Sequence, residues 1–256
     1  MLFVNELRRI SVVLVRARNP ANIGAVARAM HDFGFQSLRV VNEFPVPFEA
    51  ARSAVDASAV MQSAVSYASV ADAVADCNLV IGTTAVGERE LRHELLPLAS
   101  AAVRIRTALG DGETRVAILF GSEKTGLSNE ELSYCHWLLT IPMHGHEGLR
   151  HASMNLGQAT AVCLYELVRE AMPNAAPNAA MEVKQPSAPA ASLERITALL
   201  QQVCEATEYT RRHAANSDPA NVRRLVRRIG IDPVDAPIWA GIFRQILWKL
   251  GGTREP

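Results

Sequence analysis

The sequence predicts an α/β fold with a mostly parallel sheet, helices on both faces of the sheet and a small C-terminal helical domain. Five short apolar runs recur over the first 142 of 256 residues, and amphipathic helical patterns separate them, as in βαβ units. A stretch rich in alanine and proline then interrupts the periodicity. We therefore expect a sheet domain over residues 1–171, a flexible linker over 172–191 and a helical extension over 192–256.

The elements of the sheet domain follow from residue type in chain order. The apolar runs predict strands at 10–15, 37–42, 78–83, 115–120 and 137–142. Gly34 and Gly110 follow helical patterns as C-terminal caps, and Ser128 with Glu131 forms a capping-box pattern. The longest helix of this region is expected to begin near Ser153.

The extension is expected to hold three helices. Apolar residues repeat at helical spacing behind Ser192, which is the expected N-cap of the first. Asp218 and Pro219 open a second helix that Gly230 closes, and residues 237–250 form a third. Three short helices are too little for an enzyme, so we interpret the extension as an appendage.

Composition points to a soluble cytoplasmic protein. Apolar residues make up 49% and charged residues 20%, and no apolar run approaches the ~20 residues that span a bilayer. The first residues lack the pattern of a signal peptide. The four cysteines are isolated, which predicts neither a disulfide framework nor a zinc knuckle. We expect no membrane contact and a reducing compartment.

The charge distribution leaves nucleic-acid binding open. The net charge is zero, but residues 1–170 hold 15 Lys and Arg against 18 Asp and Glu, and residues 191–256 hold 10 against 7. Within 221–229 lie four arginines: Arg223, Arg224, Arg227 and Arg228. They are candidates for contacts with RNA phosphates. The alternative is that they form a solvated helix face.

The usual phosphate-binding loops are missing from the sequence. No Gly-x-Gly-x-x-Gly follows an expected strand, and no Gly-x-x-x-x-Gly-Lys-Ser/Thr is present. A nucleotide-like ligand must therefore be held by strand-end loops of another shape. Three such loops are candidates: 19–30, 120–132 and 141–159.

The first loop reads N-P-A-N-I-G-A-V-A-R-A-M. Its start can expose Asn22 to a ligand, and Arg28 lies about two turns into the following helix. The structural alternative makes Asn22 an N-cap and Arg28 a surface arginine.

The second and third loops combine glycine with polar residues. In the second, Gly121 and Gly126 let the backbone approach a ligand, with Glu123 at the strand mouth; a plain strand–turn–helix connection explains the glycines equally well. The third loop contains four potential metal ligands: His144, His146, Glu147 and His151. Their spacing lacks a further ligand for zinc. We expect no metal and histidines that face solvent or substrate.

Taken together, the three loops resemble a known family. N-P-x-N-I-G-A-x-x-R, F-G-x-E-x-x-G-L and I-P-M followed by S-M-N-L resemble the three motifs of the SPOUT superfamily of RNA methyltransferases, in its SpoU branch. The motifs stand in order at the ends of the first, fourth and fifth expected strands, and the resemblance covers residues 8–171. The linker and C-terminal helices are most similar to the TrmJ type, which 2′-O-methylates position 32 of the tRNA anticodon loop.

The resemblance implies a trefoil knot in the C-terminal part of the sheet domain, a homodimer, and S-adenosylmethionine bound among the knotted loops. The implied catalytic residues, facing the ribose, are Arg28, Asn22, Glu123 and Ser153. The implied cofactor-binding residues are Thr83, Thr84, Ala85, Gly121, Ile141, Pro142, Met143, Ser153, Met154 and Asn155.

The implied chemistry explains why an asparagine and an arginine replace a glycine-rich turn. A ribose 2′-hydroxyl is a very weak acid, so methyl transfer needs proton removal and an in-line hydroxyl. Because an arginine stays charged, Arg28 is expected to hold the adjacent phosphate and lower the pKa of the hydroxyl. A direct role as base has been proposed in the family. Asn22 is expected to bond the sugar or orient Arg28.

Two departures and three alternatives accompany this interpretation. Met154 stands where leucine is commoner, a change that conserves volume, and the loop 144–151 is longer than expected for the TrmJ type. Ribosomal RNA or another tRNA position is the alternative substrate. The alternatives in other classes are a non-catalytic RNA-binding SPOUT module and a flavodoxin-like nucleotide binder, which the missing phosphate loop disfavours.

Overall fold

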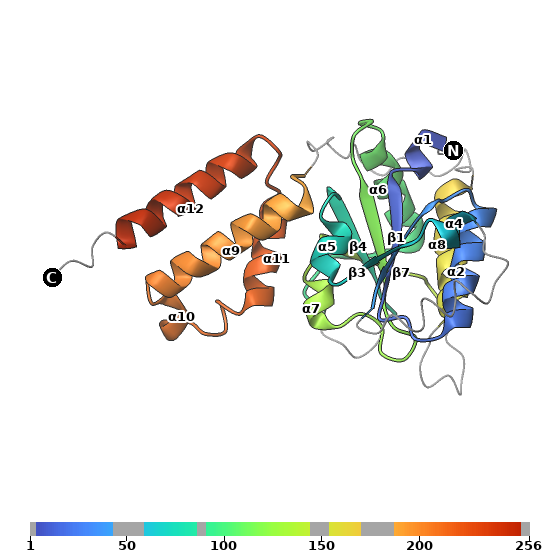
Figure 1. Cartoon of the computed structure of the whole chain (residues 1–256), viewed down its shortest axis with the longest axis horizontal. Helices are drawn as coiled ribbons and strands as arrows, with labels where there is room; N and C mark the ends of the chain where they lie inside the picture. The colour runs from blue at the N-terminus through green and yellow to red at the C-terminus, as the bar shows by residue number, and fades with distance from the viewer. Residues whose placement is uncertain (1–3, 43–58, 86–90, 144–153, 170–186, 252–256) are drawn as a thin grey trace.

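A seven-stranded, wholly parallel sheet forms the centre of the sheet domain, and the helical extension lies to one side of it (Figure 1). The structure is a computed structural model that describes residues 4–42, 59–85, 91–143, 154–169 and 187–251. The strand order is β3-β2-β1-β6-β4-β7-β5. The strands are β1 (Ile10–Val15), β2 (Ser37–Val41), β3 (Val65–Tyr67), β4 (Leu79–Thr83), β5 (Leu95–Pro97), β6 (Val116–Phe120) and β7 (Trp137–Thr140).

Helices cover both faces of the sheet, as the sequence predicts. One face packs against α2 (Pro20–Asp32), α4 (Ala59–Gln62), α6 (Leu98–Leu109) and α8 (Leu156–Val168). The other face packs against α5 (Val70–Val74), α7 (Asn129–Leu132) and the first turn of α9 (Ala190–Ala206). Alternate residues of β1 enter the two cores, Leu14 on one side and Val13 on the other, because successive side chains of a strand point to opposite faces.

The five predicted strands are confirmed to within two residues at each end. The prediction missed β3 and β5, which have three residues each and pair along one side only. Val65 of β3 is exposed, and all three residues of β5 are at least partly exposed. Edge strands of this length carry no continuous apolar run, so the pattern that identifies buried strands is absent from them.

The helix caps correct two predictions in the sheet domain. Asn19, and not Asn22, is the N-cap of α2, and its side chain accepts from the amide of Ala21. Asn155 caps α8, so that helix begins three residues after Ser153. The Ser128–Glu131 capping box is present at α7.

The chain after residue 187 forms a separate helical layer. It contains α9, α10 (Tyr209–Arg212), α11 (Pro219–Ile229) and α12 (Asp235–Gly251). Asp218 caps α11 and Gly230 ends it in the left-handed conformation, as predicted. Pro189 precedes α9, so the predicted N-cap at Ser192 is wrong by one turn. A small core around Leu193, Val226 and Phe243 joins α9, α11 and α12.

The helical extension docks on the α5 and α7 side of the sheet domain (Figure 1). The amide of Ala190 donates to the carbonyl of Cys77 at 2.9 Å, and that of Ala191 to Ala75 at 3.1 Å. Asn78 also donates to the carbonyl of Ser187 at 3.0 Å. The amides at the start of α9, which have no partner within the helix, therefore attach the extension to the end of α5.

The implied knot and the expected absence of a membrane-spanning segment both involve residues that the structure describes only in part. The threading of the implied knot depends on the connection through 144–153, which lies outside the described residues. None of the helices in the described ranges combines the length and the hydropathy that crossing a bilayer requires.

Candidate active site at the carboxyl ends of the central strands

The three predicted loops meet at one edge of the sheet. They follow β1, β6 and β7, and the segment after β4 lies among them, because β1, β6, β4 and β7 are consecutive neighbours. The chain builds outward from β1 through β2 to β3 and then crosses to the other half of the sheet. Ligands of open parallel sheets bind at such a reversal, beyond the carboxyl ends of the strands.

Asn22 connects all three loops through its side-chain amide. Its Nδ2 donates to Glu123 Oε1 at 3.0 Å, and its Oδ1 accepts from Asn155 Nδ2 at 3.0 Å. Asn155 Oδ1 in turn accepts from the amide of Gly157 at 2.9 Å. In this structure Asn22 therefore bonds protein on both sides, which favours a positioning role over direct contact with the sugar.

Glu123 closes the turn after β1. Its carboxylate accepts from the backbone amides of Arg18 and Asn19, each at 3.2 Å. Burial alone would raise the pKa of Glu123, but these amides and the Asn22 side chain favour the ionised form and hold the pKa below its ordinary value. An anion stabilised in this way is a weak base at neutral pH, so Glu123 also fits a positioning role better than proton abstraction.

Arg28 stands apart from this network. It lies six residues beyond Asn22 on α2, roughly 9 Å along the helix axis, and it is exposed. Among the described residues none forms a hydrogen bond or ion pair with its guanidinium. Within the part of the chain that the structure describes, this cation is therefore open to an external anion.

The cofactor-binding residues predicted on β4 and β7 lie side by side. Thr83 Oγ1 donates to the carbonyl of Leu119 at 2.9 Å, and the amide of Thr84 donates to Leu139 at 3.0 Å. Ala85 is exposed at the end of this segment. After β7, Ile141 and Met143 are partly exposed and Pro142 is exposed. The edge thus presents half-exposed apolar side chains beside polar backbone, which suits an uncharged aromatic base.

Gly121 is required by the fold of the second loop. A Cβ on Gly121 would lie 2.1 Å from the carbonyl carbon of Gly126 and 2.2 Å from the nitrogen of Leu127. Gly126 has a φ of 64° and donates its amide to Ser122 at 2.9 Å. The loop therefore folds back on itself directly at the end of β6, and a side chain at 121 would displace it.

Arg16 is a site-building residue that the sequence analysis missed. It follows β1 with a φ of 56°, a conformation uncommon for residues other than glycine. Its guanidinium binds both carboxylate oxygens of Glu131, at 2.5 and 2.9 Å, and donates to the carbonyl of Gly126 at 3.1 Å. Arg16 thus holds the second loop against the first, and no local pattern could have revealed a contact across 115 residues.

Several predicted site residues are only partly placed. Met154 is partly exposed at the start of the third motif. Ser153 and the four potential metal ligands, His144, His146, Glu147 and His151, lie outside the described residues.

The four arginines of α11 do not form one RNA-binding face. Arg223 Nε donates to Glu194 at 3.1 Å, and Arg227 NH2 donates to the same carboxylate at 2.8 Å. Arg227 also donates to the carbonyl of Tyr134 at 2.9 Å, and its side chain is only 1% exposed. In this arrangement Arg227 is inaccessible to RNA, contrary to the prediction, whereas Arg224 and Arg228 remain at least partly exposed.

The parallel sheet and the linked loops at its carboxyl edge define an α/β protein whose candidate ligand site lies beyond the carboxyl ends of the central strands. The sequence identifies the family more narrowly than the fold does. Residues 9–165 match the SpoU rRNA methylase family, and the chain belongs to this family. The family explains why the loops lack a phosphate-binding glycine pattern.

Relatives and solved structures agree with this assignment. The chain is 31% identical to tRNA (cytidine/uridine-2′-O-)-methyltransferase TrmJ of Sodalis glossinidius (strain morsitans), over 98% of this chain and 94% of the relative. It is also 31% identical to TrmJ of Escherichia coli (strain K12), and the match covers 97% of this chain and 99% of the relative. The crystal structure of TrmJ from Z. mobilis ZM4 superposes with a TM-score of 0.71 at 27% identity, covering 92% of this chain and 98% of that one.

Proposed function

We propose that this protein transfers a methyl group from S-adenosylmethionine to the 2′-oxygen of a ribose in tRNA, at position 32 of the anticodon loop. The observation that carries the proposal is the junction of the three family loops through Asn22, with Arg28, which has no partner among the described residues, on the same helix. The similarity to the tRNA 2′-O-methyltransferases extends through the helical extension, since it covers 98% of the chain. This full-length similarity favours tRNA over ribosomal RNA.

The residues at the edge of the sheet fit the proposed cofactor. S-adenosylmethionine supplies an electrophilic methyl group and carries no phosphate, so the site needs no glycine-rich phosphate loop. Ile141, Met143 and Met154 offer partly exposed apolar surface for adenine. The backbone after Thr83 offers polar groups for its edge, and Gly121 lets the second loop pass close to the sheet.

The protein side chains supply position and charge. Arg28, unpaired among the described residues, binds the phosphate next to the target ribose and stabilises the alkoxide that develops as the hydroxyl proton passes to solvent water. Asn22 and Glu123 hold the start of α2, and hence Arg28, at a fixed distance from the cofactor loops. Ser153 completes the catalytic set at the start of the third motif.

Homodimer formation is part of the proposal. On α8, Val162 is 36% and Tyr165 is 53% exposed, and the ring of Tyr165 lies 6.1 Å from that of Phe33 beside α2. An exposed apolar surface next to the helix that carries Arg28 suits a second copy of the chain. Cytoplasmic location is also proposed, because the four cysteines are free thiols.

The experiment that tests this function uses two RNA substrates in parallel. Bulk tRNA and ribosomal RNA, both unmodified, are incubated with methyl-labelled S-adenosylmethionine, and the labelled nucleoside is mapped. We expect label at position 32 of tRNA. Label confined to ribosomal RNA would replace the substrate, and binding of tRNA without transfer would support the non-catalytic module.

A further inference from the structure

The chain adopts an uncommon backbone conformation at Arg16, between β1 and the first loop. Its φ of 56° lies in the left-handed region, which only Glu208 shares among the other non-glycine residues that the structure describes. This conformation brings Cβ close to the following carbonyl oxygen, so glycine is the residue that usually adopts it. Residues of other types persist there when their surroundings hold them, and such positions cluster at functional sites.

The backbone around Arg16 is held by the end of β2. The amide of Arg16 donates to the carbonyl of Val41 at 2.8 Å, and Nδ2 of Asn42 donates to the carbonyl of Ala17 at 3.1 Å. Neither bond involves the guanidinium of Arg16, so both bonds are open to other residue types at this position. The turn itself therefore does not require an arginine.

The guanidinium of Arg16 binds the second loop at two points. Its Nε and Nη2 donate to the two carboxylate oxygens of Glu131, at 2.5 and 2.9 Å, and Nη2 also donates to the carbonyl of Gly126 at 3.1 Å. The side chains of Arg16 and Glu131 are only 26% and 13% exposed. A planar guanidinium that binds two oxygens fixes orientation as well as distance, so this pair sets how the second loop lies against the first.

The capping box of α7 holds Glu131 in place for this ion pair. The carboxylate of Glu131 accepts from the amide of Ser128 at 2.6 Å, and Ser128 Oγ accepts from the amide of Glu131 at 3.2 Å. Burial alone would raise the pKa of Glu131, but the hydrogen bonds from Arg16 and Ser128 hold that pKa below its ordinary value. The carboxylate is therefore charged at physiological pH, and its own helix fixes its orientation.

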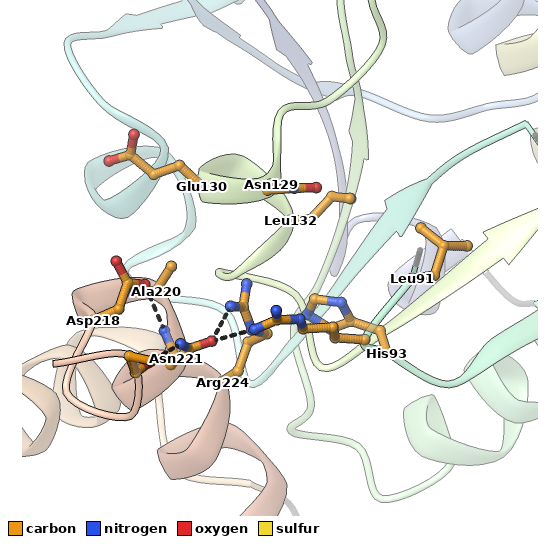
Figure 2. A pocket seen from close by; sticks show the side chains of 11 residues that line it. Leu91, His93, Asn129, Glu130, Leu132, Asp218, Ala220, Asn221 and Arg224 are labelled. Carbon is orange, nitrogen blue, oxygen red and sulfur yellow. Dashed lines mark hydrogen bonds between the residues drawn. The ribbon is translucent and has the colours of Figure 1, made fainter. Parts of the chain in front are cut away.

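The neighbours of Glu131 on α7 lie in different surroundings. Asn129, Glu130 and Leu132 line, together with Arg224 of α11, a cavity of about 570 Å³ beside the helical extension (Figure 2). Glu131 is not among the residues that line this cavity. Glu130 is exposed, so it offers a matched comparison: an adjacent carboxylate on the same helix that is not bound to the first loop.

Gly126 connects the ion pair to the proposed cofactor site. Its backbone lies directly against Gly121, because a Cβ on Gly121 would lie 2.1 Å from the carbonyl carbon of Gly126. Between the two glycines, Glu123 accepts from two backbone amides that follow Arg16 in the chain. The second loop is therefore attached to the chain after β1 at two places, by Glu123 near its start and by Arg16 further along.

We propose that Arg16 is a positioning residue that sets the affinity for S-adenosylmethionine, because it holds the second loop in the binding conformation through Gly126 and Glu131. The proposal rests on the proposed function, which assigns Gly121 to the cofactor site. Without the guanidinium the loop stays attached through Glu123 alone, so the cofactor has to order the rest of the loop when it binds, which weakens binding. The bound geometry is then the same, so the transfer step itself is preserved.

The variant Arg16→Gly separates the side chain from the turn. Glycine adopts a left-handed conformation without strain, so this variant keeps the backbone and removes only the guanidinium. We expect the calorimetric Kd and the KM for S-adenosylmethionine to rise about tenfold, while kcat with unmodified tRNA stays within about twofold. Glu208→Gly makes the same backbone change before α10, with a φ of 57°, and should leave all three quantities unaltered.

A second variant tests the other side of the ion pair. Glu131→Gln keeps an acceptor for the amide of Ser128, since glutamine also suits a capping box, but it removes the charge that Arg16 binds. We expect the same rise in Kd and KM for the cofactor. Combining it with Arg16→Gly should add less than the sum of the two losses, because both remove one contact. Glu130→Gln is the control and should bind the cofactor normally.

Three results would overturn the proposal. Cofactor affinity could be unchanged in both Arg16→Gly and Glu131→Gln, or kcat could fall with KM for the cofactor unaltered, which would place Arg16 in the transfer step. Equal losses in Arg16→Gly and Glu208→Gly would show that the backbone change and not the side chain is responsible. Failure of the proposed function is a separate outcome, because the unaltered protein would then transfer no methyl group to RNA.

Discussion

The side-chain amide of Asn155 donates a 3.0 Å hydrogen bond to Asn22 across 133 residues of sequence. This bond joins the first motif to the third. Asn22 also donates a hydrogen bond to Glu123, which belongs to the second motif. The three loops therefore form one hydrogen-bonded unit, and the unit should respond as a whole when either asparagine is replaced.

We expect Asn22→Ala and Asn155→Ala each to lower the rate of methyl transfer about 2- to 10-fold, since each removes a solvent-exposed hydrogen bond whose net contribution is about 0.5–1.5 kcal/mol. The double variant should lose less than the sum of the two single losses, because the hydrogen bond between Asn22 and Asn155 is counted in both. Gln158→Ala, an exposed neighbour on α8, is the control. Fully additive losses would show that the two residues act independently.

Replacing Arg28 should separate turnover from cofactor binding. The guanidinium is exposed and unpaired among the described residues, so Arg28→Ala removes the proposed substrate contact without breaking a hydrogen bond or ion pair to any of those residues. We expect kcat to fall at least 100-fold while calorimetric affinity for S-adenosylmethionine persists. Arg18→Ala, whose exposed side chain lies in the same loop region, should retain turnover. Unchanged turnover in Arg28→Ala would remove Arg28 from the catalytic residues.

A methyl group at Gly121 should abolish cofactor binding. The added Cβ would lie 2.1 Å from backbone of Gly126, and backbone cannot move aside as a flexible side chain can. Gly241→Ala is the matched control, because nothing lies within 4 Å of its added Cβ and it stands within a helix. Gly241→Ala should stabilise the protein by up to about 1 kcal/mol. A Gly121→Ala protein with unaltered cofactor affinity would contradict the described loop.

Acidification should destabilise the protein through His136. Burial first, and then the charge of Arg227, lower the pKa of this largely buried histidine from 6.5 to about 3, and its Nδ1 accepts from the amide of Val80 at 3.0 Å. The unfolded chain takes up a proton near pH 6.5 and the folded chain does not until about pH 3. The contribution is therefore retained above pH 6.5 and is lost progressively as the pH falls, by about 2 kcal/mol between pH 7 and 5.

Urea unfolding at the two pH values measures this loss, with His136→Asn as the comparison. Asparagine keeps an acceptor for the amide of Val80 but does not titrate, so its pH dependence should be smaller by about 2 kcal/mol. An identical pH dependence in both proteins would rule out His136 as the source.

Removing Glu194 should loosen the helical extension. Its carboxylate is the anionic partner of Arg227, whose side chain is 1% exposed, and of Arg223. Glu194→Ala leaves a buried guanidinium unpaired, which costs about 3–5 kcal/mol, and should shift the urea midpoint downward. Glu205→Ala removes an exposed carboxylate from the same helix and should have little effect. Equal midpoints for the two variants would show that the Glu194 contact is not stabilising.

The sequence predicts the central strands well because burial on both faces leaves a continuous apolar run, as in β1 and β6. Edge strands such as β3 lack this run and escape detection. Local capping chemistry was readable at Ser128 and Asp218. The pattern does not identify the cap in the first loop, because Asn19 and Asn22 both precede apolar residues and only the turn geometry distinguishes them.

The sequence predicts which loops form the candidate site, but it does not predict which of their residues contact one another. The motifs identify Asn22, Glu123 and Asn155, but their hydrogen bonds join residues more than 100 positions apart. The same limit applies to α11. Its spacing separates two pairs of arginines, yet only the docked structure shows that Arg227 faces Glu194 and Arg224 faces a cavity.

Alkaline hydrolysis of tRNA labelled by this enzyme tests the central claim most directly. Alkali cleaves RNA through the free 2′-hydroxyl, so a 2′-O-methyl group protects the bond that follows it. We expect the label in alkali-resistant dinucleotides that begin with the nucleoside at position 32. Label recovered entirely in mononucleotides would show that the methyl group is on a base, and would contradict ribose methylation by this site.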